Sequence, residues 1–292
     1  TCYKWLKVVT LTNQSGEVTV TSVYSLNREP FIYGFIGLFF LLLCIVGGKN
    51  GLKAVIGLVI TFILVLLYLF PAIYRGMSPV NAAVITVILT TIITIFVLTG
   101  YTRKSLAAIL GTISGVIISG IAAWLFGKIS GISGYNVSNI DNLVSVANCT
   151  NIKIGDLLFA GILISSLGAV MDVGLSVAST ITEIHDVNPE LNTGELFKRG
   201  MNVGKDMMGT MANTLILAFA GGSLSELLLD YAYNLPYLQI VNSYTIGIEL
   251  MRGVAGSIGI ILTVPLVSLF ASVLMKIKFK FIDSPVVSED TV

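Results

Sequence analysis

From residue 31 onwards, the chain alternates between long apolar segments and shorter polar connections. A membrane-spanning helix needs about 20 consecutive, mostly apolar residues. Seven segments approach or exceed this length, namely 31–47, 54–73, 79–100, 105–126, 157–182, 207–229 and 247–274. The pattern therefore predicts an all-α membrane protein, a polytopic bundle of about seven transmembrane helices.

The first 30 residues are more polar and follow a different pattern. Residues typical of strands occupy positions 8–11 and 17–24, and the second run alternates valine with threonine. Between them, Asn-Gln-Ser-Gly at 13–16 is typical of a turn. We expect a β-hairpin stub on the extracytoplasmic side, with a disordered tail as the alternative. Because the chain begins at Thr1 rather than at methionine, we expect the stub to end a truncated β domain.

Composition supports the membrane assignment and narrows the chemistry. Apolar residues make up 55% of the chain and charged residues only 11%, against about 25% charged in soluble domains. The net charge of +1 and the lack of a basic patch argue against nucleic acid. One histidine and three cysteines lack metal-ligand spacing, so we expect no metal or cofactor. Cys2 and Cys149 fall on the same predicted side and could form a disulfide.

The distribution of lysine and arginine predicts the orientation, because these residues favour cytoplasmic connections. With residues 1–30 outside, ten of them fall inside and seven outside, and the short connections show the bias most clearly. We expect the stub outside and the C-terminus inside. The predicted parts are a stub (1–30), four helices (31–126), an outer loop that is either a lid or a connector (127–155), a three-helix segment (156–275) and a cytoplasmic tail (276–292).

Small residues recur four positions apart in two predicted spans. Gly111, Gly115 and Ser119 share one face of the fourth span, and Gly253 and Ser257 share a face of the seventh. Such spacing lets membrane helices approach closely. Further candidates for close packing are Gly168, Gly221 and Gly222.

The segment 157–182 carries one acid, Asp172, far from either end. A carboxylate inside hydrocarbon costs about 2.5 to 3.5 kcal/mol even on the scale derived from insertion experiments. On a helix, Asp172 shares a small, polar face with Ser165, Gly168 and Ser176. Such a face indicates contact with another helix or with water. Asp172 is therefore either a relay or coupling acid, or a structural acid hydrogen-bonded to a neighbouring helix.

A second polar stripe follows in the next span, with Asp206, Thr210, Asn213 and Thr214 in its first half. Consecutive spans run antiparallel, which places Asn213 and Thr214 within about two helical turns of the depth of Asp172. We predict that these side chains, with Ser176, form a proton or ion relay around Asp172. Asp206 is equally well explained as a surface acid beside Lys205.

Three further polar features have simpler expected roles. The threonines of the third span at 86, 90, 91 and 94 either bond their own helix backbone or line a pathway. Asn192 and Glu195 have the spacing of a capping box, which predicts a helix from about Thr193. Glu249 and Arg252 are three residues apart, so we expect an ion pair at the membrane interface.

The runs GAVMDVGLSVASTITEI (168–184) and LFKRGMNVGKDMMGTMANTLILAFAGG (196–222) resemble the YibE/F-like family of bacterial multispan membrane proteins. The resemblance extends over nearly the whole chain, including GGKNGLKAVIGL, SLAAILGTISG and RGVAGSIGIILTVPLVS. It implies a bacterial cytoplasmic (inner) membrane location. The family has no settled biochemical function, so the resemblance adds no mechanism.

A more distant resemblance connects the last three spans with the transmembrane half of RND exporters and SecF. Gly168 and Asp172 match the Gly-x-x-x-Asp pattern, Thr210 lies near the threonine, and Gly221 with Gly222 matches the glycine pair. Two features depart from the pattern. Val173 stands where exporters have a second acid, and the intramembrane lysine of the exporters is absent, because these spans carry no lysine or arginine away from their ends. A relay through Asp172 would therefore need a partner chain or another counter-group.

We expect a transporter or permease component, proton-coupled through Asp172, that moves a small solute or ion. A non-transporting scaffold or assembly subunit, similar in role to SecF, is the alternative. An enzyme is not expected, because Asp172 and Asp206 are the only conceivable acid pair and lie in no hydrolase motif. The expected partners are membrane lipid and, since RND halves pair, a second copy or a homologous chain; this last step is by analogy.

Overall fold

We describe a computed structural model of the chain for residues 8–15, 18–137, 140–148 and 150–277. Cys2 and Cys149, for which a disulfide was one option, lie outside these residues, as does most of the predicted cytoplasmic tail. The chain divides into two compact units, residues 1–56 and 57–292.

The first unit contains a two-stranded antiparallel sheet. Strand β1 (Val8–Ser15) pairs with β2 (Val18–Leu26), with Val8 opposite Leu26 and Ser15 opposite Val18. The pairing is irregular between Val9 and Thr10. Alternating valine and threonine in β2 suits an extended backbone, because β-branched side chains pack well on a pleated surface.

Helix α1 (Glu29–Leu64) begins in this unit and contains a sharp turn at Gly48. Gly48 has φ of 52° and ψ of −130°, a conformation that side-chain-bearing residues rarely adopt. After the turn, a Cβ placed at Gly51 would clash with the backbone carbonyl of Leu43. In a straight helix these two residues would be about 12 Å apart, so the chain folds back on itself here.

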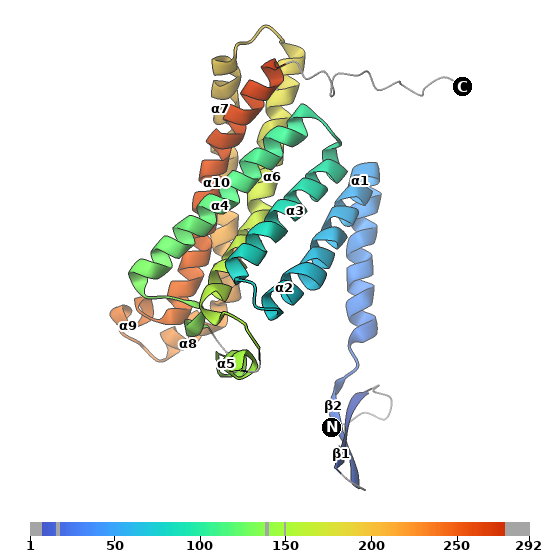
Figure 1. The fold of residues 1–292 in the computed structure, drawn as a ribbon, viewed down its shortest axis with the longest axis vertical. Helices are drawn as coiled ribbons and strands as arrows, with labels where there is room; N and C mark the ends of the chain where they lie inside the picture. Colours follow the sequence, from blue (N-terminus) through green and yellow to red (C-terminus); the bar gives the residue numbers. More distant parts are fainter. Residues whose placement is uncertain (1–7, 16–17, 138–139, 149, 278–292) are drawn as a thin grey trace, which may run out of the picture. The chain divides into compact units, whose positions relative to one another are not determined.

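The second unit is helical (Figure 1). After the end of α1, its longer helices are α3 (Pro79–Thr99), α4 (Arg103–Ser130), α6 (Leu157–Val187), α7 (Thr193–Gly222) and α10 (Tyr244–Lys276). Shorter elements connect them: the π-helix η1 (Val65–Leu69), α2 (Phe70–Tyr74), the 3-10 helices η2 (Gly134–Asn136) and η3 (Ile154–Asp156), α5 (Ile140–Asn148), α8 (Leu224–Ala232) and α9 (Tyr237–Val241). The predicted outer loop thus contains three short helical segments.

Five helical stretches in the described part of the chain are long and apolar enough to cross a membrane. The count becomes six if α7 and α8, which meet at a bend of 60°, form one broken span. The predicted segments 31–47 and 54–73 fall in one stretch, Glu29–Tyr74. The predicted sixth span, 207–229, is interrupted at Ser223, where α7 ends. The all-α class is therefore confirmed, whereas the predicted number of seven spans is not confirmed by the described helices.

The start of α7 follows its predicted capping chemistry. The Asn192 side chain accepts a hydrogen bond from the Glu195 backbone N–H at 2.8 Å, and Glu195 Oε2 accepts one from the Asn192 N–H at 2.9 Å. The capping box and the helix start at Thr193 are confirmed.

Helix α10 packs against α4, α6 and α7 in the second unit (Figure 1). The contact with α4 depends on glycine. A Cβ at Gly115 would clash with the Thr263 hydroxyl, and one at Gly111 would clash with Val267. On α10, Gly259 similarly meets Ser119, with a Cβ distance of 2.8 Å to the Ser119 Cβ. Small residues at these positions allow the two backbones to approach closely.

We expect Gly115→Leu to lower the melting temperature of the detergent-purified protein by at least about 3 °C, because overpacking a core costs about 1 to 3 kcal/mol. Gly221→Leu is the matched control, since a Cβ there meets no atom within 4 Å. Both variants replace a helical glycine with leucine, and only the one at Gly115 places the side chain against another helix. Equal melting temperatures would show that α4 and α10 are not held together at Gly115.

Candidate functional site on helices α6 and α7

One face of α6 is left uncovered by the described helices of the second unit, and Asp172 lies on it. Gly161, Ser165, Gly168 and Asp172 are exposed at successive four- and three-residue steps, whereas Ser176 is half-buried. The opposite face holds fully buried aliphatic residues, including Val170, Val173, Val177 and Ile181. α6 therefore has an aliphatic side that packs in the bundle and a small, polar side that does not.

Asp172 makes no hydrogen bond or ion pair with any residue that the structure describes. Its helix is long and apolar enough to span a membrane, and residue 172 lies near the middle of it. In a bilayer, the second unit by itself would turn the carboxyl group toward hydrocarbon, at a cost of about 2.5 to 3.5 kcal/mol or more. A covering partner for this face would reduce that cost.

The polar side chains predicted on α7 are also exposed. Asp206, Thr210, Asn213 and Thr214 all lie on the uncovered side of this helix. The Thr210 hydroxyl donates to the Asp206 carbonyl at 3.2 Å, and the Thr214 hydroxyl donates to the Thr210 carbonyl at 2.9 Å. Within the described residues no hydrogen bond joins this stripe to Asp172. One chain thus presents the predicted relay residues but does not connect them.

Five of the glycines predicted to pack helices fall into two groups. Gly111 and Gly115 lie in the contact between α4 and α10. A Cβ at Gly168, Gly221 or Gly222 would meet no atom within 4 Å. These three therefore take no part in packing within a single chain, and their role in contact with another chain stays a prediction.

The four threonines predicted to bond their own helix or to line a pathway are buried in α3, and three of them have no hydrogen-bond partner among the described residues. Thr86 donates to the Ala82 carbonyl at 2.8 Å, as expected for a hydroxyl bonded to its own helix. The hydroxyls of Thr90, Thr91 and Thr94 have no hydrogen-bond partner. None of the five cavities described for this chain is lined by them. They lie in a packed contact, which gives no support to a pathway along α3.

Near the start of α10, the expected ion pair is confirmed. Arg252 Nη1 lies 2.8 Å from Glu249 Oε1. Glu249 also lines a cavity formed by the bend between α7 and α8, which the apolar pattern did not predict. A hint lies in Gly221-Gly222-Ser223, which can end a helix, followed by the amphipathic run Leu224–Ala232. Within the part of the chain that the structure describes, no group of three His, Cys, Asp or Glu side chains could hold a metal ion.

The fold and its long apolar helices define a polytopic helical membrane protein. Residues 35–277 match the family described as YibE/F-like protein, which covers most of the chain. The chain belongs to the YibE/F-like family. No curated protein and no solved structure matched it. The distant similarity to the RND and SecF transmembrane half stays a prediction.

We expect Thr91→Val to leave stability unchanged or to raise it by up to about 1 kcal/mol, because removing a buried hydroxyl without a partner removes a desolvation cost. Thr86→Val, which removes the bond to the Ala82 carbonyl, is the comparison and should be the less stable variant. Thermal melting in detergent measures both. If Thr91→Val were the less stable of the two, the Thr91 hydroxyl would have a partner such as a buried water.

Proposed function

We propose that the chain is a transporter or permease component of a bacterial cytoplasmic membrane, proton-coupled through Asp172. The observation that carries the proposal is a carboxyl group near the middle of a membrane-length helix, on a face of small residues. Acids at this depth are costly and mark ion or proton paths in membrane proteins. The exposed Thr210, Asn213 and Thr214 supply hydroxyl and amide groups for such a path on the adjacent helix.

The working unit that we propose is a homodimer, or a pair with a homologous chain, joined through the uncovered faces of α6 and α7. Glycine and serine at 161, 165 and 168 would let a second helix approach closely. In a two-fold interface the same patch faces itself, so α7 of one copy can meet α6 of the other. In this dimer the Asp172 carboxyl group would contact the partner's Thr210 or Asn213 instead of lipid.

The proposed topology has seven passes, with the β stub outside and the C-terminus inside. The turn at Gly48 supports two passes within α1, and Lys49 and Lys53 beside this turn fit the cytoplasmic side. α7 and α8 together would make a broken sixth pass. In this orientation Asp172 lies in the inner half of the bilayer, about 15 Å from the end of its span.

A non-transporting scaffold or assembly subunit is the second candidate. It is favoured by the lack of a cavity lined by Asp172 among the five described. In that case the uncovered face of α6 would bind a helix of another membrane protein, and Asp172 would form a structural hydrogen bond across the interface.

We expect Asp172→Asn to reduce proton flux through proteoliposomes at least tenfold, because an amide cannot take up and release a proton. A pH-sensitive dye trapped inside vesicles under an imposed pH gradient measures the flux. Glu190→Gln, in the exposed connection after α6, is the matched control and should retain wild-type flux. Full flux in the Asn protein would refute coupling through Asp172. A folded wild-type protein without flux would support the scaffold.

We expect Gly168→Leu to shift the detergent-purified protein from dimer to monomer, with at least tenfold weaker association, and to leave its melting temperature as monomer unchanged. The reason is that Gly168 has open space within its own chain, so a larger side chain obstructs only a partner. Size-exclusion chromatography with light scattering measures the mass. Gly37→Leu on α1, also in open space, is the control. A monomeric wild type, or a variant as dimeric as wild type, would contradict this arrangement.

A further inference from the structure

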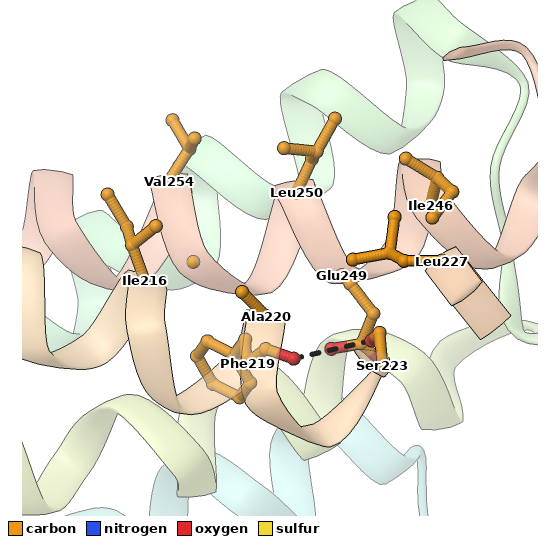
Figure 2. A pocket seen from close by; sticks show the side chains of 10 residues that line it. Ile216, Phe219, Ala220, Ser223, Leu227, Ile246, Glu249, Leu250 and Val254 are labelled. Atoms are coloured by element: carbon orange, nitrogen blue, oxygen red, sulfur yellow. Dashed lines mark hydrogen bonds between the residues drawn. The ribbon is translucent and has the colours of Figure 1, made fainter. Parts of the chain in front are cut away.

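A cavity lies in the elbow where α7 ends and α8 begins. The two helices meet at 60°, and Ser223 at the bend is buried and donates from its N–H and hydroxyl to the Phe219 carbonyl at 3.1 and 3.3 Å. The elbow and α10 enclose about 210 Å³ (Figure 2). Apolar side chains dominate the lining, among them Phe219, Ala220, Leu227, Leu250 and Val254. Glu249 is the charged residue at its wall.

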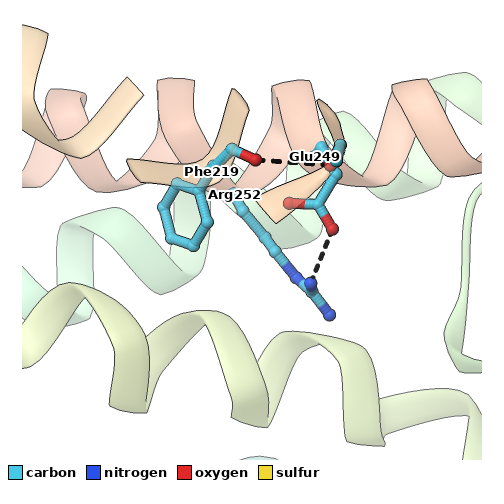
Figure 3. Close-up of polar contacts among 4 residues, drawn as sticks. Phe219, Glu249 and Arg252 are labelled. Carbon is cyan, nitrogen blue, oxygen red and sulfur yellow. Dashed lines mark hydrogen bonds and ion pairs between the residues drawn. The ribbon is translucent and has the colours of Figure 1, made fainter. Parts of the chain in front are cut away.

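Glu249 also lines a second, polar cavity of about 300 Å³ on the neighbouring face of α10. Asn136, Thr245 and Arg252 contribute to this cavity. The ion pair between Glu249 and Arg252 (Figure 3) is 21% and 33% exposed at its two side chains, so both charges remain accessible. An apolar cavity and a polar cavity that contains both signs of charge therefore share a wall.

A third cavity of about 260 Å³ lies on the other side of Leu250 and Val254. Phe126, Met251 and Ile258 are among its lining residues. Because Leu250 and Val254 line both apolar cavities, they form a ridge with an apolar hollow on either side. Each hollow is smaller than the 300 to 1,000 Å³ usual for small-molecule pockets. Each suits part of a hydrocarbon chain.

We propose that these three cavities bind one zwitterionic phospholipid from the surrounding leaflet. One acyl chain fills the elbow cavity, and the other lies across the Leu250–Val254 ridge against Phe126. The lipid phosphate lies against Arg252 and the ammonium group against Glu249. A zwitterion matches the site because the protein pair is itself neutral, so a lipid with a net charge would leave one charge uncompensated.

The depth of the charged pair fits a headgroup. Glu249 and Arg252 lie about 7 and 12 Å along the helix axis from Tyr244, the first residue of α10, at 1.5 Å per residue. Long charged side chains at this depth reach the interface while their stems lie along apolar surface. The exposed Leu228, Tyr231 and Tyr237 of α8 and α9 lie near the same end of α10. Tyrosine is enriched at the membrane interface.

The test uses the full-length chain in nanodiscs that contain phosphatidylethanolamine with a photoactivatable acyl chain. After irradiation, peptide mass spectrometry should show saturable labelling of the segments 216–227 and 246–258, competed by unlabelled phosphatidylethanolamine. Ala220→Trp and Val254→Trp each fill the lining and should reduce this labelling at least fivefold. Ala232→Trp, exposed on α8 outside the cavity lining, is the matched control and should not. Two filling variants guard against the misfolding of either one.

A separate arm tests the headgroup. Glu249→Gln leaves Arg252 without its acid, so we expect competition to shift at least fivefold from phosphatidylethanolamine toward anionic phosphatidylglycerol. An unchanged preference would overturn the assignment of a zwitterionic headgroup. Non-saturable labelling spread evenly over exposed faces, such as that of Leu269 and Val273, would overturn the site and leave only bulk lipid contact.

Discussion

The close approach of α10 to α4 is the contact on which the second unit depends. Lipid chains are as apolar as leucine, so membrane helices are held together by packing rather than by expulsion of water. Glycine at 111, 115 and 259 provides this packing by removing the side chain that would separate the backbones. α6 joins the same contact, since a Cβ at Gly174 would come within 2.7 Å of the Thr112 hydroxyl. Once α4, α6 and α10 are fixed in this way, the orientation of α6 about its axis is fixed as well.

That orientation determines where the acid lies. With Val170, Val173 and Val177 buried, Asp172 must lie on the other side of α6, because side chains two residues from a buried position point about 200° away from it. The exposure of Asp172 thus follows from the aliphatic packing. The aliphatic side of α6 completes the bundle of one chain, whereas its small and polar side is free for another. This division is the physical basis for proposing that function requires more than one copy.

Local chemistry was predictable from the sequence where it acts over three or four residues. The capping box at Asn192 and the ion pair at Glu249 follow from spacing alone. The helical class follows from the length of the apolar segments. The number of spans was not predictable in the same way, since hydropathy does not distinguish two helices from one helix folded at Gly48. The sequence also could not show that Asp172 and the polar stripe on α7 are not hydrogen-bonded to each other within the described residues. Helical spacing gives the face on which each residue lies, but not how one helix is rotated relative to another.

The Glu249–Arg252 pair and Asp172 differ in how the free-energy cost of placing a charged group in lipid is reduced. Glu249 and Arg252 neutralise each other within one turn of helix, near an end of α10 where both side chains can reach water or headgroups. Asp172 has neither a base in reach nor a short distance to the interface. Its segment 166–178 contains no lysine or arginine. A lone acid at that depth must take up a proton or gain a partner from outside the chain, and either event couples the state of α6 to its surroundings. Such coupling is what a proton-linked transporter requires, and a static assembly subunit would use only the second.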